Sequence, residues 1–554
     1  MKKFLQDPRV LYFATLVLLL LPNIGLSVTE PMTLSDRVTN LLLPGGLYIL
    51  LLTISRNPAR NFWISFLLVF LSAFQIVLLY LFGGSIIAVD MFLNLVTTNP
   101  SEVEERLGSL LPAVIGVVVV YVPVIVLAVV KTRTAGYELT RRFRSLARRF
   151  GVAVTLAGCV SLTVSCLTGE DVRQGRYRVD DSLYPVNVFY NIYLAGERTA
   201  LSSAREDKIS SFNFEAGATH RPDSLREVYV MVIGETARAE NFGIYGYERE
   251  TTPGLSSTPG VIAFPEAYTQ SNTTHKSVPM LLSAASAVDF DRVYDQKGIL
   301  SAFSEAGFHT AFISNQRPNH SFIDLLGQEA DEWYFLKEEA QGSENIYDIS
   351  LVEALDSLMK SRRDQNLFVV LHTYGSHFRY NERYPSSMRR WSPDMPDDAV
   401  ASNREALLNA YDNTILYTDR VLTDIIERLA AEGGCSALLY ASDHGENIFD
   451  DDRNLFLHAS PRPSAHELHV PLIAWTSDRH RALYPEVTRA MESNLARRVI
   501  TSASMFHSML GLGGIATDHY ADSLSVTSGQ LADLPYYYLS DRNIPVPIER
   551  IVRK

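Results

Sequence analysis

The sequence predicts an α-helical transmembrane domain followed by an α/β domain whose mostly parallel central sheet is covered by helices. Three observations lead to this fold class. The first 169 residues contain five long stretches without a charged residue. After residue 226, short apolar runs rich in β-branched residues alternate with helical segments, which is typical of a parallel sheet buried on both faces. The net charge changes from basic to acidic between these two regions.

Length and charge divide the chain into three parts. A chain of 554 residues is too long for one hydrophobic core. Residues 1–169 carry 14 Lys and Arg against 8 Asp and Glu, whereas the remainder carries 36 against 54. We expect a transmembrane domain at 1–169, a linker with interfacial helices at 170–225 and a soluble domain at 226–554. The acidic soluble part argues against nucleic-acid binding, which needs Lys and Arg to neutralise phosphates.

Five uncharged stretches are long enough, or nearly so, to cross a bilayer. The second is the weakest because it contains Pro44-Gly45-Gly46. A signal peptide is the alternative for the first, but four further stretches behind it favour an uncleaved anchor. Buried helices of a soluble protein would need a large polar shell that this region lacks. The stretches are Val10–Val28, Val38–Ser55, Asn61–Val89, Leu107–Val130 and Phe150–Gly169.

The loops between these stretches alternate in charge, which predicts their orientation. The N-terminus is basic, and Lys131–Arg149 holds seven Lys and Arg against one Glu. Because basic segments stay in the cytoplasm, we expect a cytoplasmic N-terminus, five crossings, and everything after Gly169 on the opposite side. Ser85–Leu107 mixes apolar and acidic residues and Val186–Arg198 is rich in aromatic residues, so both are predicted to lie at the membrane surface.

In the soluble part, strand-like runs end in polar residues. VYVMVI (Val228–Ile233) leads to Glu235, LFVVLHT (Leu367–Thr373) to His377, and SALLYAS (Ser436–Ser442) to Asp443-His444-Gly445-Glu446. The other elements that we expect are a helix, turn and strand at Gly298–Ser314, a long helix at Arg404–Gly433 and a strand at Val470–Thr476. Ligands of such sheets bind beyond the carboxyl ends of the strands.

Strand-end Glu, Asp and His residues predict a metal site. A single such residue is more often structural, but several on separate strands fit a catalytic zinc or manganese ion with an open position. The three cysteines contain no CxxC pair, so neither a thiolate zinc site nor a disulfide framework is indicated. Asp443 and His444 are adjacent, and neighbours point opposite ways in a strand. Both can reach one site only if the chain turns at this point.

A cluster of hydroxyl and amine side chains lies in YTQSNTTHKSVPMLLSAAS (Tyr268–Ser286), just before an apolar helix-like run. One interpretation is structural, because Thr and Ser commonly cap helices. The other is that one hydroxyl is a nucleophile at a helix start, where backbone N–H groups and the helix dipole favour a phosphate. This stretch does not decide between the two.

Six motifs in order resemble the phosphoethanolamine transferases. This family modifies lipopolysaccharide, includes the mobile colistin-resistance enzymes and belongs to the alkaline phosphatase superfamily. The resemblance covers nearly the whole chain, since five N-terminal spans and a periplasmic catalytic domain are also the plan of the family. The motifs are GETARAENFGIYGYERETTP (Gly234–Pro253), NTTHKSVP (Asn272–Pro279), HTYGSHFRYNERYP (His372–Pro385), YDNTILYTD (Tyr411–Asp419), YASDHGEN (Tyr440–Asn447) and LHASP (Leu457–Pro461).

The resemblance implies roles for individual residues. The family nucleophile lies five residues before the proline of the SVP element, which selects Thr274 over Thr273 and Ser277. His377 and His458 match family histidines near the phosphoryl group and would hold a second zinc ion or protonate the leaving group. The remaining matches are the zinc ligands Glu235, Thr274, Asp443 and His444, the pocket residue Glu446, and His466 and His469 as alternatives to the matched histidines.

The implied activity is transfer of phosphoethanolamine from phosphatidylethanolamine to lipopolysaccharide, on lipid A or a core sugar, through a covalent intermediate on zinc-bound Thr274. A threonine hydroxyl has too high a pKa to attack unaided, so a metal must activate it. The resemblance implies one zinc ion, with a second as an option. It also implies a multi-pass protein of the inner membrane with a periplasmic catalytic domain and a role in polymyxin resistance. We expect a monomer.

Departures from the family leave the acceptor open. Many relatives carry several periplasmic disulfides, but here the stretch NIYDIS (Asn345–Ser350) has no cysteine before it. The low cysteine content and the SNQ element (Ser314–Gln316) favour the branch that modifies the lipopolysaccharide core. The alternatives are a phosphoglycerol transferase, a membrane-tethered sulfatase or phosphatase, and a non-enzymatic envelope protein that binds metal. A type I sulfatase needs a C/S-x-P-x-R element, which is absent around Thr274.

Overall fold

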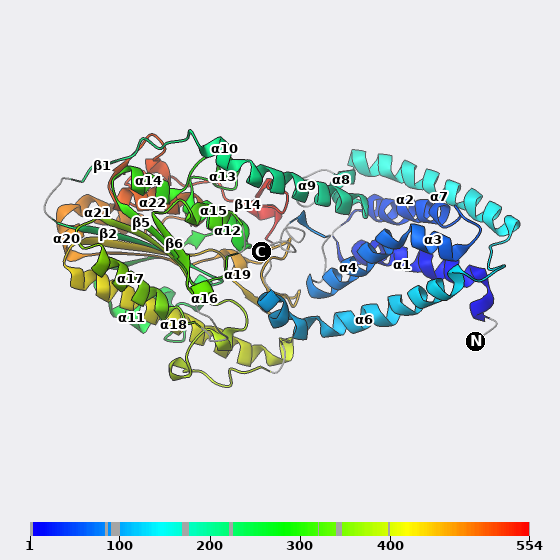
Figure 1. Cartoon of the computed structure of the whole chain (residues 1–554), viewed down its shortest axis with the longest axis horizontal. Coiled ribbons are helices and arrows are strands. Elements are labelled where there is room, and N and C mark those ends of the chain that lie inside the picture. Colours follow the sequence, from blue (N-terminus) through cyan, green and yellow to red (C-terminus); the bar gives the residue numbers. More distant parts are fainter. Residues whose placement is uncertain are drawn as a thin grey trace. The chain divides into compact units, whose positions relative to one another are not determined.

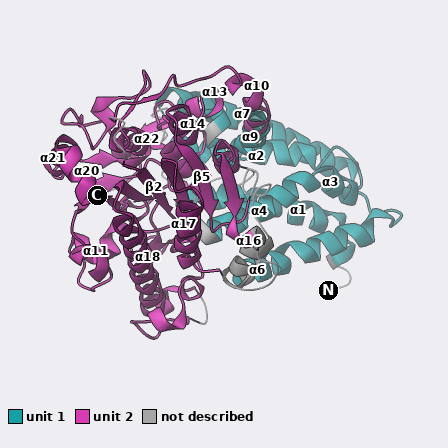
Figure 2. Ribbon diagram, turned by 60° about the vertical axis from the view of Figure 1, so that its left-hand side comes forward, with its two compact units in different colours: residues 1–96, 106–197 teal, residues 97–105, 198–554 magenta. Residues whose placement is uncertain are grey.

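The chain forms two compact units in a computed structural model that describes residues 4–30, 32–82, 87–89, 100–168, 177–220, 225–318, 321–339, 346–396 and 399–552. Unit 1 comprises residues 1–96 and 106–197, and unit 2 comprises residues 97–105 and 198–554 (Figure 2). Helices α6 and α9 each contain a boundary between the units. Most of the predicted surface segment Ser85–Leu107, and Asn345 of the NIYDIS stretch, lie outside the described residues.

Unit 1 is helical. Among its described residues, α1, the part of α6 from Pro112 to Thr132, and α7 are long and apolar enough to cross a membrane. Helices α3 and α4 make a fourth span if the pair, which is bent by 65°, is counted as one. Helix α2, the second predicted span, does not qualify, so the count of five is not confirmed. The helices are α1 (Pro8–Thr29), α2 (Leu34–Leu51), α3 (Pro58–Ile64), α4 (Phe66–Phe82), α6 (Pro100–Thr132), α7 (Arg141–Thr168), α8 (Val179–Ser182) and α9 (Val186–Ser203).

Helix α2 packs closely against α7 through glycine residues. A Cβ atom on Gly158 would lie 2.6 Å from the Cα of Leu43, and one on Gly46 would lie 2.5 Å from the backbone nitrogen of Thr155. Only glycine allows this approach, which is typical of helix pairs inside membranes. The Pro44-Gly45-Gly46 stretch that weakens the predicted second span is therefore part of a helix-packing surface.

Unit 2 is built around a seven-stranded sheet with the order β3-β11-β8-β2-β7-β5-β6 (Figure 1). The pairs β8-β2, β2-β7, β7-β5 and β5-β6 are parallel, whereas β11 runs antiparallel to both of its neighbours. The sheet is thus mostly parallel, as predicted, but mixed at one edge. Its strands are β2 (Glu227–Gly234), β3 (Val261–Phe264), β5 (His309–Ser314), β6 (Glu332–Phe335), β7 (Leu367–His372), β8 (Cys435–Ser442) and β11 (Leu472–Thr476).

Helices cover both faces of the sheet (Figure 1). Alternate side chains of β2 point to opposite faces. Val228, Val230 and Val232 belong to a core with apolar residues of α17 and α18. Tyr229, Met231 and Ile233 belong to a second core with residues of α12, α14 and α22. The continuous apolar run of this strand therefore reflects burial on both sides.

The sequence predictions for strands β2, β7, β8 and β11 and for the helix, turn and strand at Gly298–Ser314 are confirmed. Helix α18 ends where Gly433 adopts a φ of 72° and its N–H bonds to the carbonyl of Ala430, a glycine C-cap. The other helices are α10 (Arg205–Ile209), α11 (Pro253–Ser257), α12 (Thr274–Leu282), α13 (Arg292–Asp295), α14 (Ile299–Glu305), α15 (Phe322–Gly327), α16 (Leu336–Glu339), α17 (Ile349–Ser361), α18 (Arg404–Glu432), α19 (Ala465–Leu468), α20 (Asp478–Leu483), α21 (Pro485–Ser493) and α22 (Thr501–Leu512).

Short strands complete unit 2 in four pairs. The pairs are β1 (Gly217–Ala218) with β13 (Ile515–Ala516), β4 (Ala267–Tyr268) with β12 (Val499–Ile500), β9 (Asn447–Ile448) with β10 (Phe456–Leu457), and β14 (Tyr537–Leu539) with β15 (Pro545–Pro547). The β9–β10 pair forms a hairpin whose last residue, Leu457, precedes His458. This hairpin brings His458 back toward the end of β8.

Candidate metal centre and active site

The carboxyl ends of β2 and β8 bring four polar side chains together. These strands are adjacent and parallel, with Gly234 opposite Ser442, so the residues that follow, Glu235 and Asp443, are neighbours. Asp443 Oδ1 accepts hydrogen bonds from the backbone N–H groups of Thr236, at 3.1 Å, and His444, at 2.7 Å. These bonds hold the turn that the sequence requires if adjacent Asp443 and His444 are to face one site.

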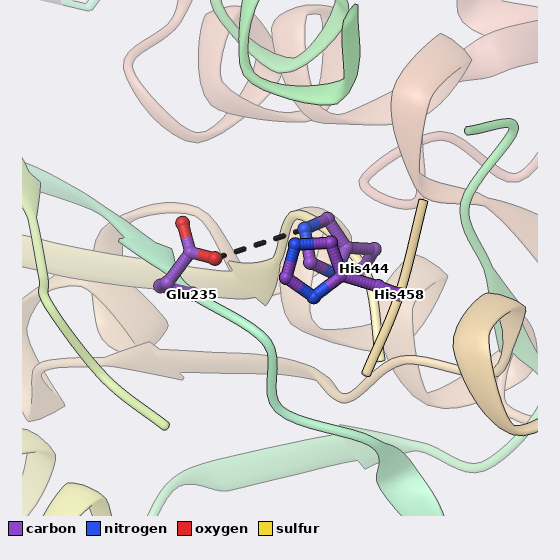
Figure 3. A group of neighbouring side chains, drawn as sticks. All are labelled: Glu235, His444 and His458. Atoms are coloured by element: carbon purple, nitrogen blue, oxygen red, sulfur yellow. Dashed lines mark ion pairs between the residues drawn. The ribbon is translucent and has the colours of Figure 1, made fainter. Parts of the chain in front are cut away.

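Two of these residues, Glu235 and His444, offer ligand atoms at one point together with His458, which follows the β9–β10 hairpin. One ligand atom each of Glu235, His444 and His458 lies within 4.8 Å of the others. In Figure 3 the carboxylate of Glu235 faces the two imidazoles, and the ion pair between Glu235 and His444 measures 3.7 Å. The ring centroids of the two histidines are 4.1 Å apart. The structure therefore places His458 with the predicted zinc ligands.

Thr274, at the start of α12, is the hydroxyl residue that faces this group. Its Oγ1 lies 3.1 Å from His444 Nε2 and 3.4 Å from Glu235 Oε2. Thr273 is the N-cap of α12, but its hydroxyl contacts Ser271 Oγ at 3.0 Å and makes no cap bond. The hydroxyl of Ser277 donates to the carbonyl of Ser271. The helix-cap interpretation therefore does not account for the cluster.

The two buried carboxylates are poorly compensated. Burial, followed by the charge of Asp443, raises the pKa of Glu235 to about 7. Burial likewise raises the pKa of Asp443. Asp443 Oδ2 is buried and has no hydrogen-bond partner among the described residues. It forms an ion pair with His444 Nε2 at 3.3 Å, and Glu235 shares that imidazole. Two buried carboxylates that share one imidazole are unfavourable, and a bound cation would remove that penalty by stabilising the charged form.

His444 is oriented for ligation. Its Nδ1 lies 2.9 Å from the carbonyl of Gly445, which requires a proton on Nδ1 and leaves Nε2 as the lone-pair nitrogen directed at Thr274. Burial lowers the pKa of His444, but the charges of Asp443 and Glu235 outweigh it, so the pKa is raised. A backbone carbonyl that fixes the tautomer is common for histidine ligands.

Glu446 positions His458. Its Oε1 is 3.0 Å from His458 Nδ1, and its Oε2 accepts a hydrogen bond from the Tyr380 hydroxyl at 3.0 Å. Glu446 is buried, whereas the His458 side chain is 9% exposed. The residues on either side of His458, Leu457 and Ala459, have φ values of 69° and 65°. Left-handed backbone at two non-glycine residues is unusual, and such conformations cluster at functional sites.

The other predicted histidines are held elsewhere. His377 lies on the loop after β7, where its Nδ1 contacts the Phe378 carbonyl at 2.8 Å. It is not part of the group of three, although its loop packs on Glu235, since a Cβ atom on Gly375 would lie 2.6 Å from the Glu235 carbonyl. His466 Nδ1 lies 2.6 Å from Oε2 of Glu240, a residue of the 3-10 helix Ala239–Asn241. His469 Nε2 lies 2.8 Å from a backbone carbonyl oxygen.

Two neighbours of Glu235 have no assigned role in the sequence analysis. The hydroxyl of Thr236 donates to Glu235 Oε1 at 2.6 Å, and the amide of Gln316 donates to Oε2 at 3.1 Å. Gln316 belongs to the SNQ element at the end of β5, so its strand-end position was the available signal. Thr236 has a φ of 62°, which the sequence does not reveal.

Residues 227–515, more than half of the chain, match the model of the family described as Sulfatase. The protein is a member of the sulfatase family. The match contains every residue of the candidate site. It extends from β2 to β13, so the sheet and the helices on both of its faces belong to the family fold.

Similar proteins bear the name that the motifs suggested. Phosphoethanolamine transferase EptC of Escherichia coli O18:K1:H7 is 26% identical over 331 residues, which cover 58% of this chain and 56% of that protein. The chain thus aligns with little more than half the length of this curated relative. The resemblance to the phosphoethanolamine transferases is confirmed.

Two solved structures share the fold. The integral membrane lipooligosaccharide phosphoethanolamine transferase A from Neisseria meningitidis matches with a TM-score of 0.71 and 20% identity, covering 94% of this chain and 98% of that one. The C-terminal periplasmic domain of Escherichia coli EptC, solved in complex with Zn, matches with a TM-score of 0.55 and 23% identity, covering 60% and 95%. The fold is therefore that of a membrane-integral protein with a soluble sulfatase-type domain.

Proposed function

We propose that this sulfatase-family protein transfers phosphoethanolamine from phosphatidylethanolamine to lipopolysaccharide, with Thr274 as the nucleophile. The observation that carries the proposal is the position of the Thr274 hydroxyl, 3.1 Å from His444 Nε2 and 3.4 Å from Glu235 Oε2. The names of the relatives support the transferred group and, for the Neisseria protein, a lipooligosaccharide acceptor. All of these groups come from one chain, which agrees with the expected monomer.

The site suits zinc. It combines carboxylates, an imidazole and a hydroxyl without any thiolate, a set typical of catalytic zinc. Asp443 Oδ2 accepts no hydrogen bond among the described residues and lies 3.3 Å from His444 Nε2, and the related EptC domain was solved in complex with Zn. Glu235, Thr274, Asp443 and His444 would hold one ion, and His377 and His458 are candidates for holding a second. A zinc ion here would lower the pKa of the hydroxyl and withdraw charge from the phosphoryl oxygens.

The residues of the chain then divide the reaction into two displacements. Thr274 gives its proton to Glu235, whose Oε2 lies 3.4 Å away, as its Oγ1 forms a bond to the donor phosphorus and the bond from phosphorus to the diacylglycerol oxygen breaks. That oxygen takes a proton from His458, which Glu446 orients. An acceptor hydroxyl then returns a proton to His458 and attacks the same phosphorus, and Thr274 leaves and takes its proton back from Glu235. The start of α12 supplies backbone N–H groups that suit the phosphate oxygens.

The membrane unit would tether the active site to the bilayer that holds the proposed substrates. We propose that α2 also crosses the inner membrane, that the N-terminus is cytoplasmic and that unit 2 is periplasmic, because basic and acidic loops alternate. Both the donor and the acceptor are amphiphiles confined to a bilayer. A reporter fused after Lys554 should be active only in the periplasm, and one fused at Arg142 only in the cytoplasm. A cytoplasmic C-terminus would contradict the five crossings.

The direct test is peptide mass spectrometry of the protein after incubation with phosphatidylethanolamine and no acceptor. We expect a phosphoethanolamine adduct on Thr274, none in Thr274→Ala, and a reduced amount in Thr274→Ser, which keeps the hydroxyl. Thr273→Ala is the matched control and should keep the adduct. An adduct on Thr273 or Ser277 would overturn the assignment. A phosphoglycerol adduct formed from phosphatidylglycerol would establish the alternative donor.

The acceptor is tested in cells. Adding a positively charged ethanolamine amine to an anionic lipid surface weakens its attraction for cationic peptides. If the acceptor is lipid A, expression should raise polymyxin tolerance and increase the mass of lipid A. If the acceptor is a core sugar, the mass should increase in the core fragment with a smaller change in tolerance. Unchanged lipopolysaccharide mass under zinc-replete expression would contradict the proposed acceptor class.

A further inference from the structure

Asn272, just before the nucleophile, connects several segments of unit 2. Its Nδ2 donates hydrogen bonds to Glu467 Oε2 at 2.6 Å and to the carbonyl of Ser460 at 2.8 Å. Its Oδ1 accepts from the Tyr538 hydroxyl at 2.7 Å, and its backbone carbonyl accepts from the N–H of Ala459 at 3.1 Å. Its side-chain amide nitrogen and oxygen both bond to residues at least 188 positions away in the sequence.

Glu467 extends this network to the loop that follows β8. Its Oε1 accepts from the backbone N–H of Ser464 at 2.8 Å, and its carbonyl accepts from the N–H of Gly445 at 2.8 Å. Glu467 and Asn272 are 0% and 1% exposed. Burial raises the pKa of Glu467 to about 7. A carboxyl group kept in such a place needs well-formed hydrogen bonds, and a fully bonded buried network holds its members rigidly.

The Asn272–Glu467 pair lies where it can control the distance between Thr274 and His458. Thr274 lies two residues after Asn272, and His458 directly precedes Ala459, which bonds to the Asn272 carbonyl. Two residues span at most about 7 Å of chain, so a displacement of Asn272 moves Thr274 with it. The same displacement breaks the bonds to Ala459 and Ser460 and releases the loop that carries His458.

We infer that the Asn272–Glu467 pair is a positioning pair that sets Thr274 against His458 for phosphoryl transfer. The inference rests on the proposed function for its kinetic part. The pair touches neither substrate nor metal, and it acts through the two segments that it joins. A purely structural pair would affect the stability of the fold without a specific effect on kcat.

The test reverses the polarity of the hydrogen bond. Asn272→Asp removes the amide that donates to Glu467 Oε2 and to the Ser460 carbonyl. The two carboxyl groups must then either repel as buried like charges or take up a proton. In the double variant Asn272→Asp/Glu467→Gln, the Gln amide donates to the Asp carboxylate, so the bond returns with its direction reversed. We expect Asn272→Asp to lower kcat by about 10- to 100-fold with little change in KM. The double variant should recover about tenfold of that loss.

Asn494 provides a matched control. It is also 1% exposed, and its Nδ2 donates to the carbonyls of Val526 and Ser528 at 2.9 and 2.8 Å. Asn494→Asp should lower the Tm, as Asn272→Asp does, while kcat stays within twofold of the wild type. If Asn272→Asp fails to fold, Glu467→Gln alone replaces it, because it keeps the side-chain volume and adds no charge.

Zinc affinity is the second readout, measured by competition with a chelator on the full-length protein in detergent. Asn272→Asp should bind zinc more weakly than the wild type, and the double variant should recover, because Thr274 and His458 both lie at the ligand group. Wild-type kcat in folded Asn272→Asp, or a double variant no better than the single, would overturn the inference. If the wild type transfers no phosphoethanolamine, the proposed function fails, and equal zinc affinity in all variants would then overturn the inference by itself.

Discussion

The two ends of the β2–β8 strand pair carry similar residues in different electrostatic states. At the amino end, Glu227 Oε1 lies 2.9 Å from His220 Nδ1, and the Tyr229 hydroxyl contacts the same nitrogen at 3.2 Å. At the carboxyl end, Glu235 and Asp443 are buried beside each other, and the pKa of each carboxyl is raised. Buried charges in proteins are normally paired. At the carboxyl end a single imidazole, that of His444, faces both carboxylates, at 3.7 Å from Glu235 and 3.3 Å from Asp443. The end with this excess of negative charge is where a cation has a role.

The largest expected effect is a difference in transfer activity between substitutions at the carboxyl end and at the amino end of the β2–β8 strand pair. Asp443→Asn should lower phosphoethanolamine transfer by about 10³-fold or more, the scale seen when a member of a catalytic set is removed. Glu227→Gln, at the amino end, should leave the rate within twofold of the wild type. Initial rates with labelled phosphatidylethanolamine, measured at equal protein folding, provide the comparison. Similar losses in both variants would show that the two ends do not differ in function.

Removal of metal should expose the uncompensated charge as a dependence of stability on pH. The pKa of Glu235 is raised from 4.5 to about 7, so the folded state holds a proton that the unfolded state has lost. The stability of the metal-free protein should therefore fall as the pH rises from about 4.5 to 7, by about 3 kcal/mol in all.

Zinc should remove this dependence, because a cation stabilises the charged carboxylates and binds only the folded site. The measurement is the Tm of the full-length protein in detergent between pH 5 and pH 8, with chelator and with zinc. In the presence of chelator, Glu235→Gln should make the Tm less dependent on pH, whereas Glu227→Gln should not. If the Tm in the presence of chelator rises with pH over this interval, the proposed excess of negative charge at Glu235 and Asp443 is wrong.

A smaller effect is expected one step away from the ligand group. Glu446→Gln removes the charge that holds His458 Nδ1 and should lower kcat by about 10- to 100-fold, as is typical of residues that orient a catalytic or ligating histidine. Tyr380→Phe removes only the donor to Glu446 Oε2 and should have a smaller effect. Single-turnover rates of adduct formation and decay on Thr274 would show which displacement His458 serves. An unchanged kcat in Glu446→Gln would show that the orientation of His458 by Glu446 does not matter for the reaction.

The smallest effect on activity is expected at the amino end. His220→Gln removes the partner of Glu227 and the ring that stacks on Tyr484 with centroids 3.7 Å apart. Leaving a buried carboxylate without its partner should lower the free energy of unfolding by about 1–3 kcal/mol. Thermal unfolding should show the loss, and transfer at 25 °C should be unchanged. A lower transfer rate without a lower Tm would show that the amino end of the strand pair has a role in the reaction.

Local patterns were sufficient to predict much of the protein. Apolar runs and their spacing predicted β2, β7, β8 and β11, because a strand buried on both faces is continuously hydrophobic. The residues after those strands predicted Glu235, Asp443 and His444 as neighbours, because parallel strands end at one edge. The sequence also contained the motifs that relate the chain to the phosphoethanolamine transferases and the spacing that selected Thr274.

Longer-range contacts could not be predicted from those patterns. Strands β3 and β6 have only four residues each and lie at the edges of the sheet, so they lack a continuous buried run. The LHASP motif selected His458 over His466 and His469, but its contact with Glu235 and His444 arises only because the β9–β10 hairpin folds back. The Asn272–Glu467 bond joins residues that are 195 positions apart.

The division follows from the range of the interactions. Periodicity, charge runs and turn residues act over a few positions, so the sequence by itself determined the two-part plan, the strands of the sheet centre and the edge at which the polar groups lie. How close His458 comes to the carboxylates, how close the Thr274 hydroxyl comes to His444 and which buried groups lack a hydrogen-bond partner depend on side-chain packing between distant segments. Only the tertiary structure decided these points, because each is a matter of a few ångströms between atoms that the chain alone does not hold together.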